Sequence, residues 1–315
     1  MHGYPSWLIP YQPRLGLSAL VKEINEIYHT FDAHRYESDH IEIRELWPEL
    51  WFQMLQRLPF RKYWRVLDFG CGNGFASEQV LRFLGDRVTV LMAYDPCSEM
   101  LLRARKKFTS DSRVILTPIE SEIWRRSPYD LLVTNSVLHH LPEGACAIHT
   151  LQQYLSHDAW WLAGNEPSSR FYANPECLQL FQEYELYQQK TKWLRPSRYL
   201  SRIHGILRTD TLSKTAEVAI RRRLLAVRPD RATVARLVDF HVQHSADDPR
   251  GFDPISLQDA LSPRWKTAWS KTYSYLGSVS ELRAGNKWRS RAAELARKFP
   301  ADGASFCSVW HQTAN

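Results

Sequence analysis

Short apolar segments alternate with amphipathic segments between about residues 63 and 166. The apolar segments lie at 65–69, 88–94, 114–117, 130–134 and 160–163, and their lengths are typical of buried strands. The segments between them, at 76–84, 98–108 and 144–155, carry apolar residues at helical spacing. Strands that alternate with helices favour a parallel sheet with helices packed against it. This part of the chain is therefore predicted to form an α/β domain.

The pattern changes after this domain. Residues 175–246 are rich in Arg, Gln and Tyr and predict consecutive helices without strands. The breaker-rich stretch 246–254 then ends this helical block. Beyond it, aromatic and β-branched residues predict strands at 266–276 and 304–312, with a helix at 287–298 between them. The helical block is therefore interpreted as an insertion before the last strands of the sheet.

Two further helices are predicted ahead of the first strand, at 17–31 and 41–58, where we expect them to cap one edge of the sheet. The predicted organisation then has three parts. They are capping helices in residues 1–60, a sheet domain formed by residues 61–170 and 251–315, and the helical insertion in residues 171–250.

Composition narrows the class of protein. Hydrophobic residues make up 44% of the 315 residues, which supplies a substantial core. The net charge of +7 permits an anionic partner, but basic runs such as 221–223 are more typical of solvated helix faces. Five cysteines without a CxxC pair favour reduced thiols. Since no apolar stretch has the length of a signal-peptide core or a membrane span, we expect a soluble, cytoplasmic protein.

The most informative stretch is VLDFGCGNG at 66–74. An apolar strand runs into Gly70, Gly72 and Gly74, and a helix follows. Glycine permits a sharp turn and lets the backbone approach a ligand that a Cβ would block. About 20 residues further on, Asp95 ends the second strand, where a carboxylate can accept hydrogen bonds from ribose hydroxyls. Together these features predict a cofactor that contains a nucleoside.

The spacing of the glycines distinguishes between such cofactors. A dinucleotide fingerprint, G-x-G-x-x-G, would place the third glycine at Phe75, whereas the chain has it at Gly74. A phosphate-binding loop of the form G-x-x-x-x-G-K-[ST] is absent as well. NAD is therefore disfavoured, and ATP more so.

Three segments resemble the class I methyltransferases that use S-adenosylmethionine (SAM). Residues 68–74 look like the first motif of that family, and 94–96 look like the end of its second strand. Residues 129–141, YDLLVTNSVLHHL, resemble the fourth strand and the loop after it, with the paired histidines common in the small-molecule branch. The resemblance implies a Rossmann-like, mostly parallel sheet with helices on both faces and an antiparallel closing strand.

The resemblance also implies how SAM would be held. Backbone groups of residues 70–72 would contact its methionine part and ribose, and Asp68 would support its amino group or the turn itself. Asp95 would hold the ribose hydroxyls, with Pro96 and Met100 beside the adenine.

Further contacts would come from later segments and from the N-terminal helices. Glu120 would face the adenine amino group, residues 135–137 would line the floor under the sulfonium, and Tyr36 would close over the cofactor. The complete predicted cofactor set is Tyr36, Asp68, Gly70, Cys71, Gly72, Gly74, Asp95, Pro96, Met100, Glu120, Asn135, Ser136 and Val137.

His140 and His139 are the predicted catalytic candidates, because they follow the fourth strand and imidazole titrates near working pH. A purely structural role is the alternative for both. Glu166, after the fifth strand, could place a carboxylate at the substrate or cap the next helix.

Acidic and histidine side chains also cluster near the end of the insertion. They are Asp239, His241, His244 and Asp247. Without a glycine-framed loop or a second histidine pair, a surface or packing role is favoured, and no metal is predicted.

These features predict a SAM-dependent methyltransferase that acts on an oxygen or nitrogen of a small or medium-sized molecule. The helical insertion would serve as a lid that selects the substrate. Two alternatives remain: a methyltransferase of RNA or another nucleic acid, and a SAM-binding protein, cyclase or lyase that transfers no methyl group.

Overall fold

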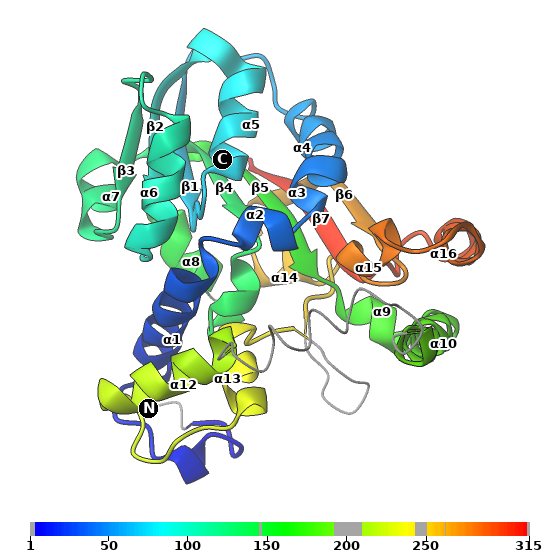
Figure 1. Cartoon of the computed structure of the whole chain (residues 1–315). Coiled ribbons are helices and arrows are strands. Elements are labelled where there is room, and N and C mark those ends of the chain that lie inside the picture. Colours follow the sequence, from blue (N-terminus) through cyan, green and yellow to red (C-terminus); the bar gives the residue numbers. More distant parts are fainter. Residues whose placement is uncertain (1–3, 145–146, 192–209, 243–250, 262, 314–315) are drawn as a thin grey trace.

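The computed structural model describes residues 4–144, 147–191, 210–242, 251–261 and 263–313. A seven-stranded sheet with helices on both faces forms its centre (Figure 1). This arrangement confirms the predicted Rossmann-like fold. Within the residues described, no helix combines the length and the apolar character needed to cross a membrane.

Most elements lie where the sequence predicts them. The strands are β1 (Trp64–Phe69), β2 (Val88–Tyr94), β3 (Val114–Thr117), β4 (Tyr129–Asn135), β5 (Leu155–Pro167), β6 (Trp265–Tyr273) and β7 (Ser305–Gln312). The helices before β4 are η1 (Ile9–Tyr11), α1 (Leu17–Asp32), α2 (Tyr36–Asp39), α3 (Glu42–Glu45), α4 (Trp47–Leu55), α5 (Phe75–Leu84), η2 (Gly85–Arg87), α6 (Ser98–Lys107) and α7 (Ser121–Arg126). Those after it are η3 (Leu138–His140), α8 (Ala147–Gln152), α9 (Ser169–Ala173), α10 (Pro175–Thr191), α12 (Thr211–Arg221), α13 (Arg231–Val238), α14 (Leu257–Ala260), α15 (Ser278–Leu282) and α16 (Asn286–Lys298).

The strands follow the order β3-β2-β1-β4-β5-β7-β6. The first five are parallel, and β7 runs antiparallel between β5 and β6, as predicted for the closing strand. β5 is longer than the predicted segment 160–163. Its first residue, Leu155, pairs with β4, and its last residue, Pro167, pairs with β7. Pairing on both sides therefore extends the strand beyond its apolar centre.

Helices cover the two faces of the sheet with separate apolar clusters. On one face, Trp51 of α4 and Val80 of α5 pack with Val66 and Val133 of the sheet. On the other face, residues of α7, α8 and α14 pack against Leu67 and its neighbours. The single edge helix predicted at 41–58 is wrong. The backbone breaks at Leu46, between α3 and α4, and α4 then lies across a face.

A further apolar cluster joins the N-terminus to the insertion. Leu20 and Ile24 of α1 pack with Ala219 of α12 and with Val234 and Leu237 of α13. In Figure 1, α12 and α13 accordingly lie beside α1, below the sheet. The two insertion helices each begin at an aspartate whose side chain accepts a backbone hydrogen bond.

The other part of the insertion is attached elsewhere. Tyr184 of α10 contacts Trp288 of α16, at 5.1 Å between ring centroids. The two helices share an apolar cluster with α9. The described helices of the insertion therefore fall into two groups, one packed against α1 and the other against α16.

Candidate active site

A cavity of about 360 Å³ lies at the carboxyl ends of β1, β2 and β4, under α1. Small-molecule sites in proteins commonly have a volume of this order. All the predicted cofactor residues line the cavity except Asp68 and Gly74. His140 lines it as well, whereas His139 does not.

The turn after β1 keeps its shape through backbone hydrogen bonds. The N–H groups of Gly70 and Cys71 both donate to the carbonyl of Tyr94, at 2.8 and 2.9 Å. Gly70 has a φ of +75°, and a Cβ at this position would lie 2.5 Å from Cγ2 of Val137. Only glycine fits here, because the turn lies directly against the loop that follows β4.

Asp95 directly follows β2, and both of its carboxylate oxygens lie close to backbone amides. Its Oδ2 accepts from the N–H of Gly72 and its Oδ1 from the N–H of Cys97, each at 2.8 Å. Burial raises the pKa of Asp95 to about 6, although these two hydrogen bonds favour the charged form. The carboxylate therefore fixes the glycine turn and the start of α6 while it faces the cavity.

Asp68 and Gly74 support the turn from outside the cavity. Asp68 is fully buried, and its Oδ2 accepts from the Ser77 hydroxyl of α5 at 2.6 Å. Burial raises the pKa of Asp68 to about 7. Gly74 has a φ of +83°, and a Cβ there would lie 2.6 Å from the Phe108 ring. Asp68 thus ties the strand to α5, and Gly74 lets the turn approach the end of α6.

The roof of the cavity is the part of the site that sequence reasoning missed. Ser18, Lys22, Glu26 and His29 of α1 line the cavity at intervals of three or four residues, so they share one side of the helix. The apolar side of α1 packs against α12 and α13. The sequence carried a signal, since α1 has an apolar and a polar side. Which side faces a ligand, however, depends on the tertiary packing.

Lys22 connects this roof to the loop after β3. Its Nζ lies 3.1 Å from Oε2 of Glu120 and 5.8 Å from the centre of the Tyr94 ring. Glu120, predicted to face the adenine, therefore lines the cavity with one oxygen already paired.

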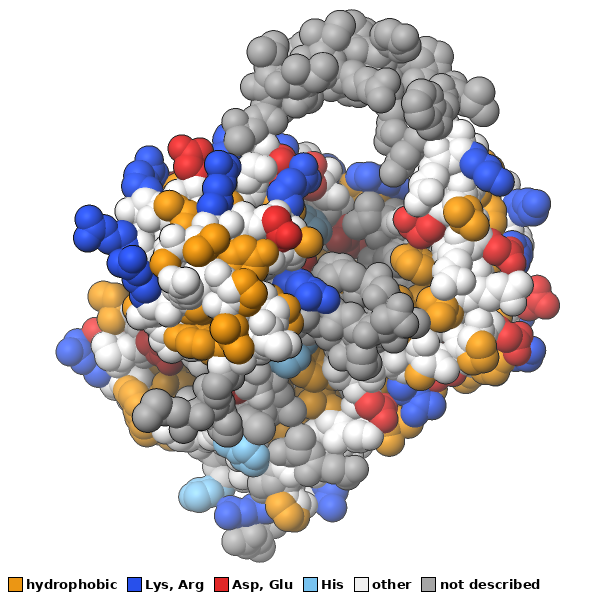
Figure 2. Space-filling model, turned by 90° about the horizontal axis from the view of Figure 1, so that it is seen from below, with side chains coloured by type: hydrophobic (Ala, Val, Ile, Leu, Met, Phe, Trp, Pro, Cys, Tyr) orange, Lys and Arg blue, Asp and Glu red, His pale blue; other side chains and the backbone are white. Residues whose placement is uncertain are grey.

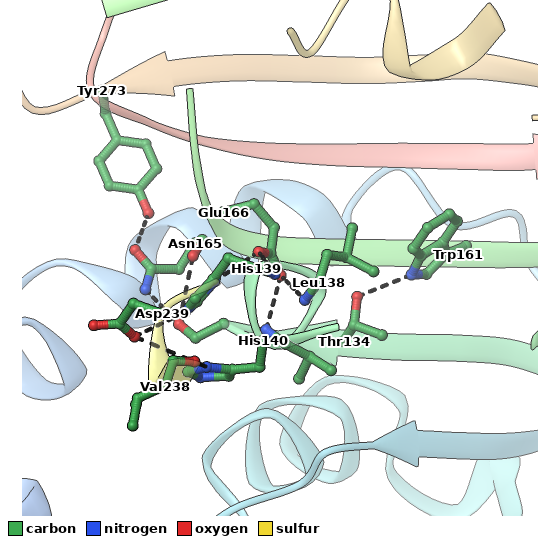
Figure 3. A network of polar contacts seen from close by, with 12 residues as sticks. Thr134, Leu138, His139, His140, Trp161, Asn165, Glu166, Val238, Asp239 and Tyr273 are labelled. Carbon is green, nitrogen blue, oxygen red and sulfur yellow. Dashed lines mark hydrogen bonds and ion pairs between the residues drawn. The ribbon is translucent and has the colours of Figure 1, made fainter. Parts of the chain in front are cut away.

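Glu166 holds the loop after β4 in place (Figure 3). It is fully buried, and its Oε1 accepts from the N–H groups of Val137 and Leu138, at 2.8 and 2.9 Å. Its Oε2 lies 3.2 Å from the N–H and 2.9 Å from Nδ1 of His139. Of the two roles considered from sequence, the structure favours capping. Glu166 caps the turn η3, which precedes it in the chain, and not the helix that follows it. Glu166 does not line the cavity.

Replacing Glu166 with Gln should destabilise the protein by about 2–4 kcal/mol, because an amide group would meet buried N–H donors that now face a carboxylate. Chemical denaturation measures this difference. Glu122→Gln, which alters a partly exposed pair with Arg125, serves as the control with little expected change. Equal stability of Glu166→Gln and the parent would contradict the capping role.

The paired histidines have different surroundings. Burial lowers the pKa of His139, but the hydrogen bond to Glu166 outweighs this effect and leaves the pKa above its ordinary value. Nδ1 of His140 lies 2.6 Å from the carbonyl oxygen of Val238. Burial, followed by the neighbouring His139, lowers the pKa of His140 to about 4. Since a carbonyl only accepts, Nδ1 of His140 carries the hydrogen and Nε2 has the free lone pair.

Asp239, at the end of α13, approaches both histidines (Figure 3). Its Oδ1 lies 3.8 Å from Nδ1 of His140 and 3.9 Å from Nε2 of His139. The spacing of the three side chains would admit a metal ion. We assign none, because the carbonyl of Val238 fixes a hydrogen on the nitrogen of His140 that is nearest to Asp239.

Of the remaining members of the cluster considered from sequence, His241 lies within the described residues. His241 donates its backbone N–H to the carbonyl of His139 at 2.9 Å, and its Nε2 lies 3.3 Å from the carbonyl of Pro142. His244 and Asp247 lie outside the described residues. His241, just after α13, is thus hydrogen-bonded to the loop that carries His139 and His140.

The cavity is suited to a cationic nucleoside cofactor. The glycine turn leaves space that a side chain would fill, and Asp95 lies where ribose hydroxyls could donate to it. Acidic side chains outnumber basic ones among the lining residues, which complements a positive sulfonium. The charged lining residues are Lys22, Glu26, Asp95, Glu120 and Glu143.

Comparison with known proteins agrees with this geometry. Residues 67–161 match the family model described as a methyltransferase domain. The match runs from β1 to β5 and includes the glycine turn, Asp95 and both histidines. No curated protein matches the chain.

Several solved structures are similar to this chain. The N-methyltransferase NodS from Bradyrhizobium japonicum is 12% identical, with 84% of this chain and 87% of NodS covered and a TM-score of 0.43. The plantazolicin methyltransferase BpumL is 13% identical, with 95% and 98% covered and a TM-score of 0.45. Both were solved with S-adenosylhomocysteine (SAH). A SAM-dependent methyltransferase from Mesorhizobium loti is 15% identical, with 84% and 97% covered and a TM-score of 0.42.

Proposed function

We propose that this chain, a class I SAM-dependent methyltransferase, methylates an oxygen or nitrogen atom of a small or medium-sized molecule. The observation that carries the proposal is the roof over the cavity. α1 covers the space beside residues 135–140, so an acceptor must fit beneath a helix to reach the cofactor. A compact molecule meets this condition more readily than a polymer.

SAM supplies a methyl group made electrophilic by its sulfonium. The chain's task is to hold the acceptor atom about 3–3.5 Å from the methyl carbon and to exclude water. We assign cofactor binding to the turn at 70–72, to Asp95 with the residues of α6, and to Glu120 and residues 135–137. Tyr36 of α2 completes this set, while Asp68 and Gly74 keep the turn in shape. His140 is assigned as the group that takes a proton from the acceptor.

A nucleic-acid acceptor is the main alternative. Proteins that bind nucleic acids usually present a continuous basic patch or stripe. On the face seen in Figure 2, Lys and Arg side chains are interspersed with Asp and Glu. This distribution supports the small-molecule proposal. Free buried thiols at Cys71, Cys97, Cys177 and Cys307 support a reducing, cytoplasmic location.

The test supplies the purified protein with methyl-labelled SAM and two separate pools, a small-molecule extract and nuclease-free total RNA. We expect label in molecules that pass a low-mass filter, together with release of SAH. Label retained in RNA would establish the alternative. Consumption of SAM without release of SAH would indicate a lyase or cyclase.

We also propose that α13 and residues 239–242 form part of a lid over the acceptor. The support is the bonding of residues 238–241 along the loop at 139–142. SAH binding should then slow amide hydrogen exchange several-fold in α1, which covers the cavity, and in α13, which packs against α1. The helix α16 lies in a different cluster and serves as the internal control. Unchanged exchange in α13 would argue against the lid.

A further inference from the structure

We propose that His29 and His140 bind the acceptor together through a hydroxyl group, so that the substrate is a phenol-type compound. This inference rests on the proposed function and names its substrate class. It also adds His29, a residue of α1, to the acceptor site.

His29 lines the cavity, and its ring lies 5.5 Å from the ring of His140 between centroids. Burial, followed by the nearby His140 and His139, lowers the pKa of His29 to about 3. The imidazole is therefore neutral at physiological pH and has one N–H and one lone pair.

The hydrogen of His29 can be assigned to one nitrogen. Its Nδ1 is shielded from solvent and has no hydrogen-bond partner among the described residues. A buried N–H without a partner is strongly disfavoured, so this nitrogen carries the lone pair. The hydrogen then lies on Nε2, which, unlike Nδ1, is not one of the shielded and unpartnered polar atoms of the described residues. The site thus offers an N–H donor from the roof.

His140 offers the opposite group. Its Nδ1 hydrogen is directed at the Val238 carbonyl, 2.6 Å away, which leaves the lone pair on Nε2 (Figure 3). The cavity therefore contains one neutral imidazole that donates and a second that accepts.

This pair of groups matches a hydroxyl. A hydroxyl donates its hydrogen to the lone pair of His140 and accepts the N–H of His29 with its oxygen. An ammonium group has only donors and would oppose His29. A carboxylate has only acceptors and would oppose His140. Of the three groups, only a hydroxyl satisfies both imidazoles at once.

The residues around the two imidazoles favour a hydroxyl that is attached to an aromatic ring. The rings of Tyr36, His29 and His140 follow one another with centroid distances of 6.5 and 5.5 Å in edge-to-face geometry. Leu141 and Pro142, which follow His140 in the chain, add apolar surface to the lining of the cavity. A flat ring can pack against such a row.

The proton balance of the transfer is simple. The acceptor oxygen bonds to the methyl carbon, and the carbon–sulfur bond breaks with its electron pair going to sulfur. The hydroxyl proton goes to Nε2 of His140. Asp239, 3.8 Å from the other ring nitrogen, is the positioning residue that stabilises the imidazolium.

The test uses calorimetry to measure the binding of four probes to the SAH-saturated protein. The probes share a benzene ring and differ in its substituent: phenol, benzoate, benzylamine and toluene. Phenol should bind at least about fivefold more tightly than the other three. His29→Leu should weaken phenol binding about five- to tenfold, the loss of one hydrogen bond, and leave toluene unchanged. His157→Leu, at an exposed position of β5, is the matched control with no expected change.

Each other outcome has a definite meaning. Tightest binding of benzylamine, or no phenol binding in the SAH complex, would overturn the hydroxyl assignment. Equal weakening of all probes by His29→Leu would make His29 a packing residue and overturn its role. The affinity for SAH is measured first in every variant. Failure of the parent protein to bind SAH would instead contradict the proposed function.

Discussion

Replacing Asp95 with Ala is expected to lower the affinity for SAM at least about a hundredfold. The carboxylate would accept two hydrogen bonds from the ribose, each worth about 1.5–3 kcal/mol when charged. The same change also removes the partners of the Gly72 and Cys97 amides, so the glycine turn loses part of its support. Both effects act in the same direction. Calorimetry with SAM and SAH measures the loss.

The pH dependence of binding gives a second measure of the same carboxylate. Burial raises the pKa of Asp95 to about 6, and the ribose hydroxyls donate to its ionised form. Affinity should therefore be complete above pH 6 and should fall as the pH drops through that value. In Asp95→Asn this dependence should be much weaker, because the residue no longer titrates.

Controls separate this effect from a general loss of structure. Asp86→Asn changes an exposed aspartate that does not line the cavity, and this variant should bind SAM like the parent. The melting temperature of Asp95→Ala is measured alongside. Unchanged SAM binding in a folded Asp95→Ala protein would remove the central assignment of the site.

Replacing His140 with Ala is expected to lower turnover at least about a hundredfold. General bases typically contribute about 10²–10⁴-fold when the acceptor must lose a proton during attack. The expected loss is specific to the chemical step, because the glycine turn and Asp95 are untouched. The affinity for SAH should therefore stay near that of the parent.

The pH–rate profile distinguishes this base from an ordinary histidine. Burial lowers the pKa of His140 to about 4, so Nε2 keeps its lone pair from neutral pH down to that region. At saturating SAM, turnover should persist below the pH at which an unperturbed imidazole becomes protonated. Addition of free imidazole should partly rescue His140→Ala. Turnover within a few-fold of the parent would assign His140 a structural role.

The sheet and the cofactor side of the cavity follow closely from local sequence. β2 and β3 begin and end at the predicted residues, because each is a compact apolar segment between polar turns. The glycine turn and Asp95 were recognisable because their spacing along the chain determines their positions at adjacent strand ends.

The acceptor side could not be derived in the same way. His29 and His140 are brought together by the packing of α1, and Val238 reaches His140 across 98 residues of sequence. Glu166 was visible as a carboxylate after a strand. Its orientation, however, depends on three amides of another loop. No local pattern encodes such contacts.

The cluster that joins α1 to α12 and α13 also determines which part of the site can be completed first while the chain is synthesised. The stretch at 67–161, with the glycine turn and Asp95, leaves the ribosome before the apolar side of α1 can pack against α12 and α13. Leu20 and Ile24 lack their contacts with Ala219, Val234 and Leu237 until residues 211–238 have emerged, so the packing behind the roof of the cavity is completed late. A nascent chain that ends before α12 carries the whole cofactor turn and yet holds an exposed helix above it.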